Sequence, residues 1–316
     1  MRVLVTGAAG FIGSHLAEAL CGKGCDVIGV DNFDAYYSRD IKERNLSRLM
    51  SDGRFTFVEG DLRREETTDA LCARAPDVVA HLAGRGGVRH SIEHPAEYLD
   101  LNTMATVRLF ESMHRAGIRK MVFASTSSIY GNSPRIPFRE DDPANAPISP
   151  YSASKKACEA LCHTYHHLHG FDVYALRFFT VYGPRNRPDM AMYKFTRALC
   201  EGREIERYGD GSTERDYTYV DDIVDGVVRA VERVRGCEII NIGGSRTSTL
   251  QNLLNVLQSA TGRTARLVER PIPPGDVMRT HADVSKAERL LNFHPTVGLE
   301  EGVRRFLDWY RQESQG

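Results

Sequence analysis

Residues 5-VTGAAGFIGSHL-16 decide the fold of this chain. They follow a short apolar run at residues 3–5 and open a segment with helical periodicity, and Gly7, Gly10 and Gly13 give them the spacing GxxGxxG. Glycine permits a tight turn, lets the backbone approach a pyrophosphate and allows a helix to pack closely on a strand. The stretch therefore predicts a strand, a phosphate-binding turn and a helix, in that order.

The second apolar run supports this interpretation, because residues 27–30 are followed directly by Asp31. A carboxylate at this position accepts hydrogen bonds from the ribose diol of adenosine and repels a 2′-phosphate, which favours NAD over NADP. The N-terminus of the helix adds free N–H groups and a partial positive charge for the pyrophosphate. A glycine turn with only a structural role would not require Asp31. We therefore predict NAD as the cofactor.

Further NAD contacts are expected where the later apolar runs end. Asp61 and Leu62 follow the third run, and residues 82–84 follow the fourth. Ordinary strand ends would explain these residues equally well, since only their position identifies them. The complete set of predicted cofactor residues is Gly7, Gly10, Phe11, Ile12, Gly13, Asp31, Asn32, Asp61, Leu62, Leu82, Ala83, Gly84, Tyr151, Lys155 and Phe178.

The order of apolar runs predicts the architecture. Runs that alternate with helical stretches occupy residues 3–5, 27–30, 55–58, 78–82, 120–124 and 173–176. Near-continuous apolar strands separated by helices indicate a parallel sheet covered on both faces, a doubly wound α/β (Rossmann) domain. We expect this domain to span residues 1–180, with residues 215–245 returning to it.

The rest of the chain is expected to form a second domain. Loops rich in glycine, proline and charge begin after residue 180, and a smaller, mixed α/β C-terminal substrate domain is predicted for residues 181–316. Residues 237–243 again read as a buried strand, and residues 299–313 have the apolar spacing of an amphipathic helix.

Composition excludes several classes of partner. The 41 Lys and Arg residues nearly balance the 42 Asp and Glu residues, so no overall field attracts nucleic acid or a membrane surface. No apolar run reaches the roughly 18–20 residues of a membrane span, and the N-terminus shows no leader, which predicts a cytoplasmic protein. The seven cysteines, without a CxxC motif, fit reduced thiols.

Two residues predict the chemistry. Tyr151 and Lys155 stand at i and i+4 of a predicted helix, hence on one face. The ammonium of Lys155, with the positive nicotinamide ring, is expected to lower the phenol pKa from about 10. Tyr151 then exchanges a proton with a substrate hydroxyl while the ring carbon gives its hydride to NAD. A surface tyrosine beside a solvated lysine is the alternative, because the YxxxK spacing is common by chance.

A run of hydroxyls precedes this pair. The sequence 123-FASTSSIYG-131 places Thr126 at the end of the fifth predicted strand, where it can hydrogen-bond the oxygen that becomes a ketone.

The histidine-rich stretch 162-CHTYHHLHG-170 has i, i+4 pairs of the kind that bind zinc. We interpret it as the continuation of the Tyr151 helix away from the reaction and predict no metal site.

These motifs resemble the extended short-chain dehydrogenase/reductase family, in its branch of nucleotide-sugar epimerases, dehydratases and decarboxylases. TGxxGxxG, Thr126 and Tyr151-xxx-Lys155 carry the likeness, which runs along essentially the whole chain. The resemblance implies a tightly held NAD and a nucleoside-diphosphate sugar gripped by the C-terminal domain. It also implies a homodimer paired through a four-helix bundle, although the apolar residues of that helix would serve a monomer core equally well.

Within that family the chain is most similar to UDP-glucuronate 4-epimerases. The similarity rests on 87-GVRHSIEHP-95, 177-RFFTVYGPRNRPDMAMYKFT-196, 215-RDYTYVDDI-223 and 273-PPGDVMRTHAD-283. It implies interconversion of UDP-glucuronate and UDP-galacturonate through a 4-keto sugar, with no net redox change. Arg85 and His90 depart from the glutamine and tyrosine expected there, which leaves the chemistry intact but bears on the sugar pocket.

A carboxylate on the sugar fits the hydroxyl run. Thr126, Ser127, Ser128 and Thr180 supply short donors, and Arg187 supplies charge; alternatively, Ser127 and Ser128 only cap the strand. An acidic residue occupies the place of Ser128 in the resembling dehydratases and decarboxylases, whereas this run has neither Asp nor Glu, so dehydration is disfavoured. Decarboxylation of the β-keto acid to a UDP-pentose, and epimerisation of neutral UDP-hexoses, remain alternatives.

Three residues receive roles only from the resemblance. Arg215 resembles the arginine that pairs with the diphosphate, Asp276 is expected at the uridine ribose, and Arg89 at the diphosphate or the carboxylate. Each of them would also make sense as part of a structural ion pair.

Overall fold

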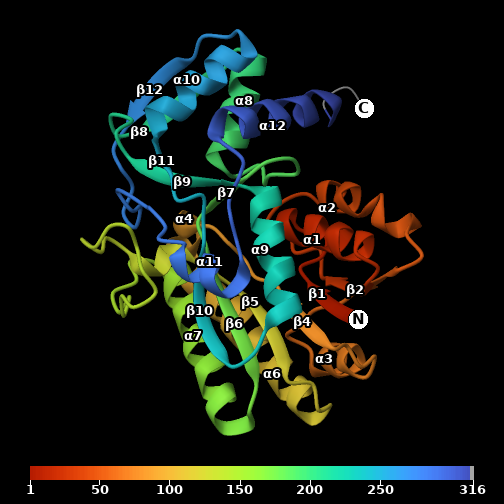
Figure 1. The fold of residues 1–316 in the computed structure, drawn as a ribbon. Coiled ribbons are helices and arrows are strands. Elements are labelled where there is room, and N and C mark those ends of the chain that lie inside the picture. Colours follow the sequence, from red (N-terminus) through yellow and green to blue (C-terminus); the bar gives the residue numbers. More distant parts are fainter. Residues whose placement is uncertain (314–316) are drawn as a thin grey trace.

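Seven parallel strands form the central sheet of the computed structural model, which describes residues 1–313 (Figure 1). Their order across the sheet is β10-β6-β5-β4-β1-β2-β3, which confirms the predicted doubly wound fold. Every strand expected from the apolar runs is present, most of them one or two residues longer than predicted. The bounds are β1 (Arg2–Thr6), β2 (Asp26–Asp31), β3 (Phe55–Glu59), β4 (Val78–His81), β5 (Lys120–Thr126), β6 (Asp172–Phe178) and β10 (Cys237–Ile242).

Helices cover both faces of this sheet. Alternate residues of β1 enter different cores: Val3 and Val5 pack with α1 and α9, whereas Leu4 packs with α3, α6 and α7. Both faces are therefore apolar, which explains why the strands read as continuous apolar runs. The helices are α1 (Phe11–Gly22), α2 (Arg39–Leu46) and α9 (Val220–Arg233) on the first side, and α3 (Glu65–Cys72), α6 (Ala105–Arg115) and α7 (Pro150–His169) on the second.

A second group of elements lies beyond the carboxyl ends of the main strands (Figure 1). Strands β7 (Thr180–Tyr182), β9 (Glu214–Tyr219) and β11 (Thr247–Thr249) form one small sheet, and β8 (Glu204–Tyr208) pairs with β12 (Arg266–Arg270). Helix α12 confirms the amphipathic helix expected at residues 299–313. The helices of this group are α8 (Ala191–Glu201), α10 (Leu250–Thr261) and α12 (Leu299–Glu313).

The chain returns to the main sheet at Val220 rather than at residue 215. Residues 214–219 form β9, which pairs with β7 and β11, and the return is made by α9 and β10. The remaining helices are α4 (Val88–Glu93), α5 (Pro95–Tyr98) and α11 (Ser285–Leu291), with a π-helical turn at Leu99–Met104 and 3₁₀ turns at Leu49–Ser51 and Ser127–Tyr130.

Local sequence explains how the two functional helices begin. Helix α1 follows Gly10, which provides no side-chain cap, so the first N–H groups remain available to an anion. Helix α7 begins with a capping box between Ser149 and Ser152 and with Pro150 at its first position, and it ends at the left-handed Gly170. Tyr151 and Lys155 are thus fixed in the first two turns of α7.

Three further observations concern residues 1–313. No helix in this part of the chain is both long and apolar enough to cross a bilayer. All seven cysteines are free thiols. The histidine-rich stretch continues α7 to His169, as expected.

Candidate active site

A cleft opens at the carboxyl ends of β1, β2 and β4, and it brings together every residue predicted to bind the cofactor. The predicted residues that line it are Gly7, Gly10, Phe11, Ile12, Gly13, Asp31, Asn32, Asp61, Leu62, Leu82, Ala83, Gly84, Tyr151, Lys155 and Phe178. The cleft also contains residues that the sequence did not single out for it, among them Asp34, Tyr36, Lys42, Arg63, Arg85 and Arg187.

Close packing of the backbone explains the glycines of this cleft. An added Cβ at Gly13 would lie 2.0 Å from the carbonyl oxygen of Gly7. Gly7 has φ +71°, and a Cβ there would lie 2.9 Å from the backbone nitrogen of Ala83. Neither position admits a side chain, so the loop can bring its backbone against a pyrophosphate.

Asp31 is fixed at the end of β2. Its carboxylate accepts hydrogen bonds from the backbone N–H of Ala9 at 3.2 Å and of Phe33 at 2.9 Å. The ammonium of Lys42, a residue that the sequence did not point to, lies 3.4 Å from Asp31 Oδ1. A held carboxylate, a glycine cradle and an uncapped helix end together fit an adenine dinucleotide with a free ribose diol.

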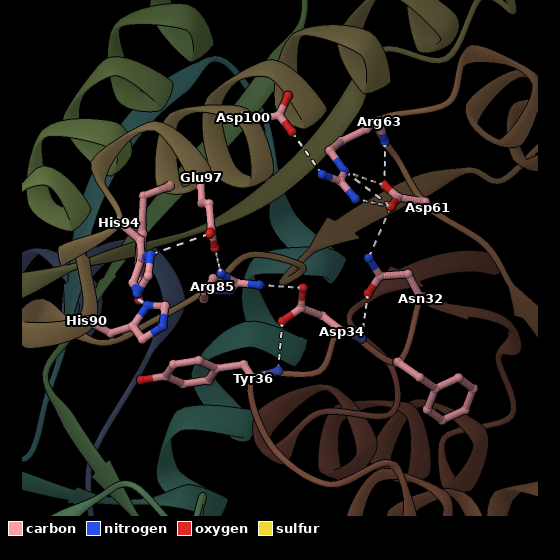
Figure 2. A network of polar contacts seen from close by, with 12 residues as sticks. Asn32, Asp34, Tyr36, Asp61, Arg63, Arg85, His90, His94, Glu97 and Asp100 are labelled. Carbon is pink, nitrogen blue, oxygen red and sulfur yellow. Dashed lines mark hydrogen bonds and ion pairs between the residues drawn. The ribbon is translucent and has the colours of Figure 1, made fainter. Parts of the chain in front are cut away.

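Ion pairs around the rim tie several loops together (Figure 2). Asp61 accepts hydrogen bonds from Asn32 at 3.3 Å and from Arg63 at 2.7 Å, and hydrogen bonding by Arg63 holds the pKa of Asp61 at about 2. Arg85, the residue that departs from the family pattern, pairs with Asp34 at 2.7 Å and with Glu97 of α5. The arginine therefore links the loop after β2 to α5.

Burial affects both catalytic candidates, Tyr151 and Lys155. The Nζ atom of Lys155 donates to the carbonyl oxygen of Ala124 at 2.9 Å, and burial lowers the pKa of this lysine. Burial raises the pKa of Tyr151, opposed by a hydrogen bond with Thr126 and by the charge of Arg187. In the chain by itself, burial dominates the pKa of Tyr151 and Arg187 supplies the nearby charge. The lowering expected from Lys155 together with the nicotinamide ring stays a prediction for the enzyme with NAD bound.

A buried ion pair lies behind these residues. Glu159, one turn after Lys155, accepts hydrogen bonds from Arg177 of β6 at 2.9 and 2.8 Å, and from the hydroxyl of Ser125 at 2.7 Å. The side chains of Arg177 and Glu159 are only 1% and 2% exposed. Ser125 thus has a structural role, because these hydrogen bonds of Glu159 hold α7 against the ends of β5 and β6.

The remaining hydroxyls face a second cavity, of about 1010 Å³, between the main sheet and the C-terminal elements. The Thr126 Oγ1 atom accepts from the backbone N–H of Ser128 at 3.2 Å, which caps the turn after β5. The predicted substrate residues line this cavity together: Arg89, Thr126, Ser127, Ser128, Tyr151, Thr180, Arg187, Arg215 and Asp276. Capping and facing a ligand are therefore compatible roles for this run.

The cations of the cavity are balanced to different degrees. Arg187 forms a two-pronged pair with Asp189, and Arg89 pairs with Asp276 at 2.8 Å. Arg215 donates to the carbonyl oxygens of Glu214 at 2.9 Å and Met278 at 3.4 Å, and it forms no ion pair within residues 1–313. Burial lowers the pKa of Arg215. An anion in this cavity would relieve that uncompensated charge.

Residues 3–243 match the NAD-dependent epimerase/dehydratase family. The chain belongs to this family. It is 41% identical to a UDP-glucuronate 4-epimerase of Thermodesulfobacterium geofontis over 312 residues, which cover 98% of this chain and 96% of the relative. NAD is the cofactor of the family, and the cleft described above has the residues to hold it.

Two solved structures of the family have the same fold. UDP-glucuronic acid 4-epimerase from Bacillus cereus, in complex with UDP-glucuronic acid and NAD, is 37% identical with a TM-score of 0.94, covering 99% of this chain and 100% of that one. UDP-glucose 4-epimerase from Thermotoga maritima, with UDP-glucose, is 33% identical with a TM-score of 0.92, covering 99% and 100%. Family members of this fold thus include enzymes of charged and of neutral sugars.

Proposed function

We propose that this chain is a UDP-glucuronate 4-epimerase. The observation that carries the proposal is that Tyr151, the hydroxyls of residues 126–128 and the guanidinium of Arg187 line one cavity beside the cofactor cleft. A base for a sugar hydroxyl and donors for a carboxylate thus lie within reach of one hexuronate. The full-length similarity to UDP-glucuronate 4-epimerases supports the same assignment.

The residues divide the proton chemistry between them. The phenolic oxygen of Tyr151 takes the proton of the C4 hydroxyl, and Thr126, which lines the same cavity, holds the C4 oxygen as it becomes a ketone. NAD, when bound, accepts the hydride of C4 and supplies the positive ring that the chain itself lacks. Lys155, which lines the cofactor cleft beside Tyr151, adds positive charge to the site. After the 4-keto sugar has turned its other face to the cofactor, return of the hydride to C4 and of the proton from Tyr151 to the C4 oxygen would complete the inversion.

The carboxylate of the sugar must be held during this step. A 4-keto uronate is a β-keto acid, which loses CO₂ when its carboxylate stands perpendicular to the ketone. Donors from Ser127, Ser128 and Thr180, with the charge of Arg187, hold it in another orientation. The run has no carboxylic acid at residue 128 for dehydration.

The UDP moiety belongs to the C-terminal side of the cavity in this proposal. Arg215 and Arg89 meet the diphosphate, and Asp276 meets the uridine ribose. Residues 1–180, with the returning α9 and β10, bind NAD, and the rest of residues 181–316 bind the nucleotide sugar. Two further proposals concern the cell. The enzyme works in the cytoplasm, where its free thiols stay reduced, and it forms a homodimer through a four-helix bundle that includes α7, the Tyr151 helix.

Proton NMR of UDP-glucuronate incubated with the purified protein, without added cofactor, tests the function. We expect the anomeric signal of UDP-galacturonate, formed with NAD that copurifies. A dominant UDP-pentose would identify a decarboxylase instead. Turnover of UDP-glucose in parallel, with UDP-glucuronate unchanged in the presence of added NAD, would contradict the role assigned to the hydroxyls and Arg187.

A further inference from the structure

The guanidinium of Arg187 lies at the border of the two cavities and lines both. Asp189 accepts from its Nε at 2.8 Å and from its Nη2 at 2.8 Å. Burial opposes the charge of Arg187, but the hydrogen bonds and charge of Asp189 outweigh burial and raise its pKa. Among residues 1–313, no side chain accepts a hydrogen bond from Nη1. Nη1 is therefore the nitrogen left for a substrate.

The position of Nη1 depends on an absent side chain. A Cβ at Gly86 would lie 2.6 Å from Nη1 and 3.4 Å from Cζ of Arg187. The neighbouring Gly84 and Gly87 have φ values of +151° and +110°, whereas Gly86 has no positive φ. Glycine at position 86 therefore leaves space for the end of the Arg187 side chain and is not needed for the backbone conformation. A larger residue there would displace the flexible end of Arg187 without forcing the main chain to move.

Tyr36 holds the other end of the Arg187–Asp189 pair. Its hydroxyl donates to Asp189 Oδ2 at 3.2 Å, and Cζ of Arg187 lies 5.7 Å from its ring centroid. Burial, and then the charge of Asp189, raises the pKa of Tyr36, so its hydroxyl stays a donor. Figure 2 shows the ring beside His90, with ring centroids 5.1 Å apart.

The segments that carry these residues are themselves anchored. The loop of Tyr36 also lines the cofactor cleft, and the ion pair of Asp34 with Arg85 fixes it. The loop of Arg187 is fastened to α1, where His15 Nε2 lies 3.0 Å from the carbonyl oxygen of Pro184. The orientation of Arg187 is thus determined from the cofactor side of the molecule.

We infer that Gly86 and Tyr36 are positioning residues that aim Nη1 of Arg187 at the substrate carboxylate, and that they thereby select a uronate over a neutral hexose. The inference rests on the proposed function and assigns its sugar specificity to two residues outside the hydroxyl run. It also gives Arg85 a role, because its pair with Asp34 supports the loop that carries Tyr36.

Gly86→Ala is the first test, with Gly22→Ala as its control, because a Cβ at Gly22 meets nothing within 4 Å. For Gly86→Ala we expect the KM for UDP-glucuronate to rise about tenfold, as for one lost charged hydrogen bond, and the share of UDP-pentose in the product to increase. The inhibition constant of UDP should stay unchanged. A merely structural role would instead weaken UDP and UDP-glucuronate alike.

Tyr36→Phe is the second test and keeps the ring. We expect a rise in KM of about threefold, in the same direction, because only the hydrogen bond to Asp189 is lost. Tyr165→Phe, on the far part of α7, is its control. Wild-type KM and product ratio in both variants, or in Tyr36→Phe alone if Gly86→Ala does not fold, would overturn the inference. A wild-type protein inert toward UDP-glucuronate would overturn the proposed function instead.

Discussion

In the cofactor cleft the backbone is tightly packed at the strand ends, whereas the sugar cavity is lined by charged side chains from distant parts of the sequence. Gly13 packs on the carbonyl of Gly7, and Asp31 is held by N–H groups. Arg89 and Asp276, by contrast, are 187 residues apart in the sequence. The cleft is therefore sensitive to volume, and the cavity is sensitive to charge.

Tyr151→Phe separates the two regions most sharply, because Tyr151 lines both. We expect the epimerisation rate to fall by a factor of about 10²–10⁴, the usual contribution of a general base. Bound NAD should be retained, because the cradle is made of backbone. NMR rates and the NAD released on denaturation measure the two effects. Loss of the cofactor together with activity would contradict a cleft that depends mainly on its backbone.

Glu159→Gln tests the buried Glu159–Arg177 ion pair, which supports α7 behind both the cleft and the cavity. It leaves the buried guanidinium of Arg177 without its charged partner, which costs about 3–5 kcal/mol of unfolding free energy. Urea denaturation measures this loss, and Glu111→Gln on the exposed side of α6 serves as the control. If the two variants unfold at the same urea concentration, the pair does not hold α7 in place.

Gly13→Ala, paired with Gly22→Ala on the same helix, tests the sensitivity to volume. The Cβ of the first would meet a carbonyl oxygen at 2.0 Å, and the second would meet nothing within 4 Å. We expect Gly13→Ala to lose about 1–3 kcal/mol of stability and to bind NAD poorly. Gly22→Ala should be neutral or stabilising. Equal NAD content in both variants would mean that the loop tolerates a side chain.

We expect the smallest effect for the Asp61–Arg63 ion pair at the rim of the cleft, where removing the arginine changes how steeply the unfolding free energy falls at acidic pH. Hydrogen bonding by Arg63 depresses the pKa of Asp61 to about 2, so this pair stabilises the fold above the ordinary value of about 4 and loses its contribution as the pH falls through 2. In Arg63→Gln the unfolding free energy should therefore fall less steeply between pH 4 and 2 than in the wild type. Parallel curves would show that solvent screens the pair completely.

The same contrast explains what the sequence could predict. Parallel strands end at one edge, so residues after successive apolar runs had to meet, and every predicted cofactor residue lines the cleft. Lys42 and Tyr36 were missed because their approach depends on how the loop after β2 folds back. A carboxylate at i+4 from Lys155 was the available signal for Glu159. The burial that raises the pKa of Tyr151 has no signature in the sequence.

The position of β10 has a consequence for the way the chain is made. It pairs with β6 along residues 237–242, and Asn241 accepts a hydrogen bond from Tyr130 at 2.8 Å. While only the first half of the chain has left the ribosome, β6 is therefore an unpaired edge strand of the nascent protein. Unpaired edge strands are surfaces on which nascent proteins aggregate. That edge is covered only after the segment that builds β7, β8 and β9 has been synthesised. We expect truncated chains that end before residue 237 to depend on chaperones, however complete their glycine loop.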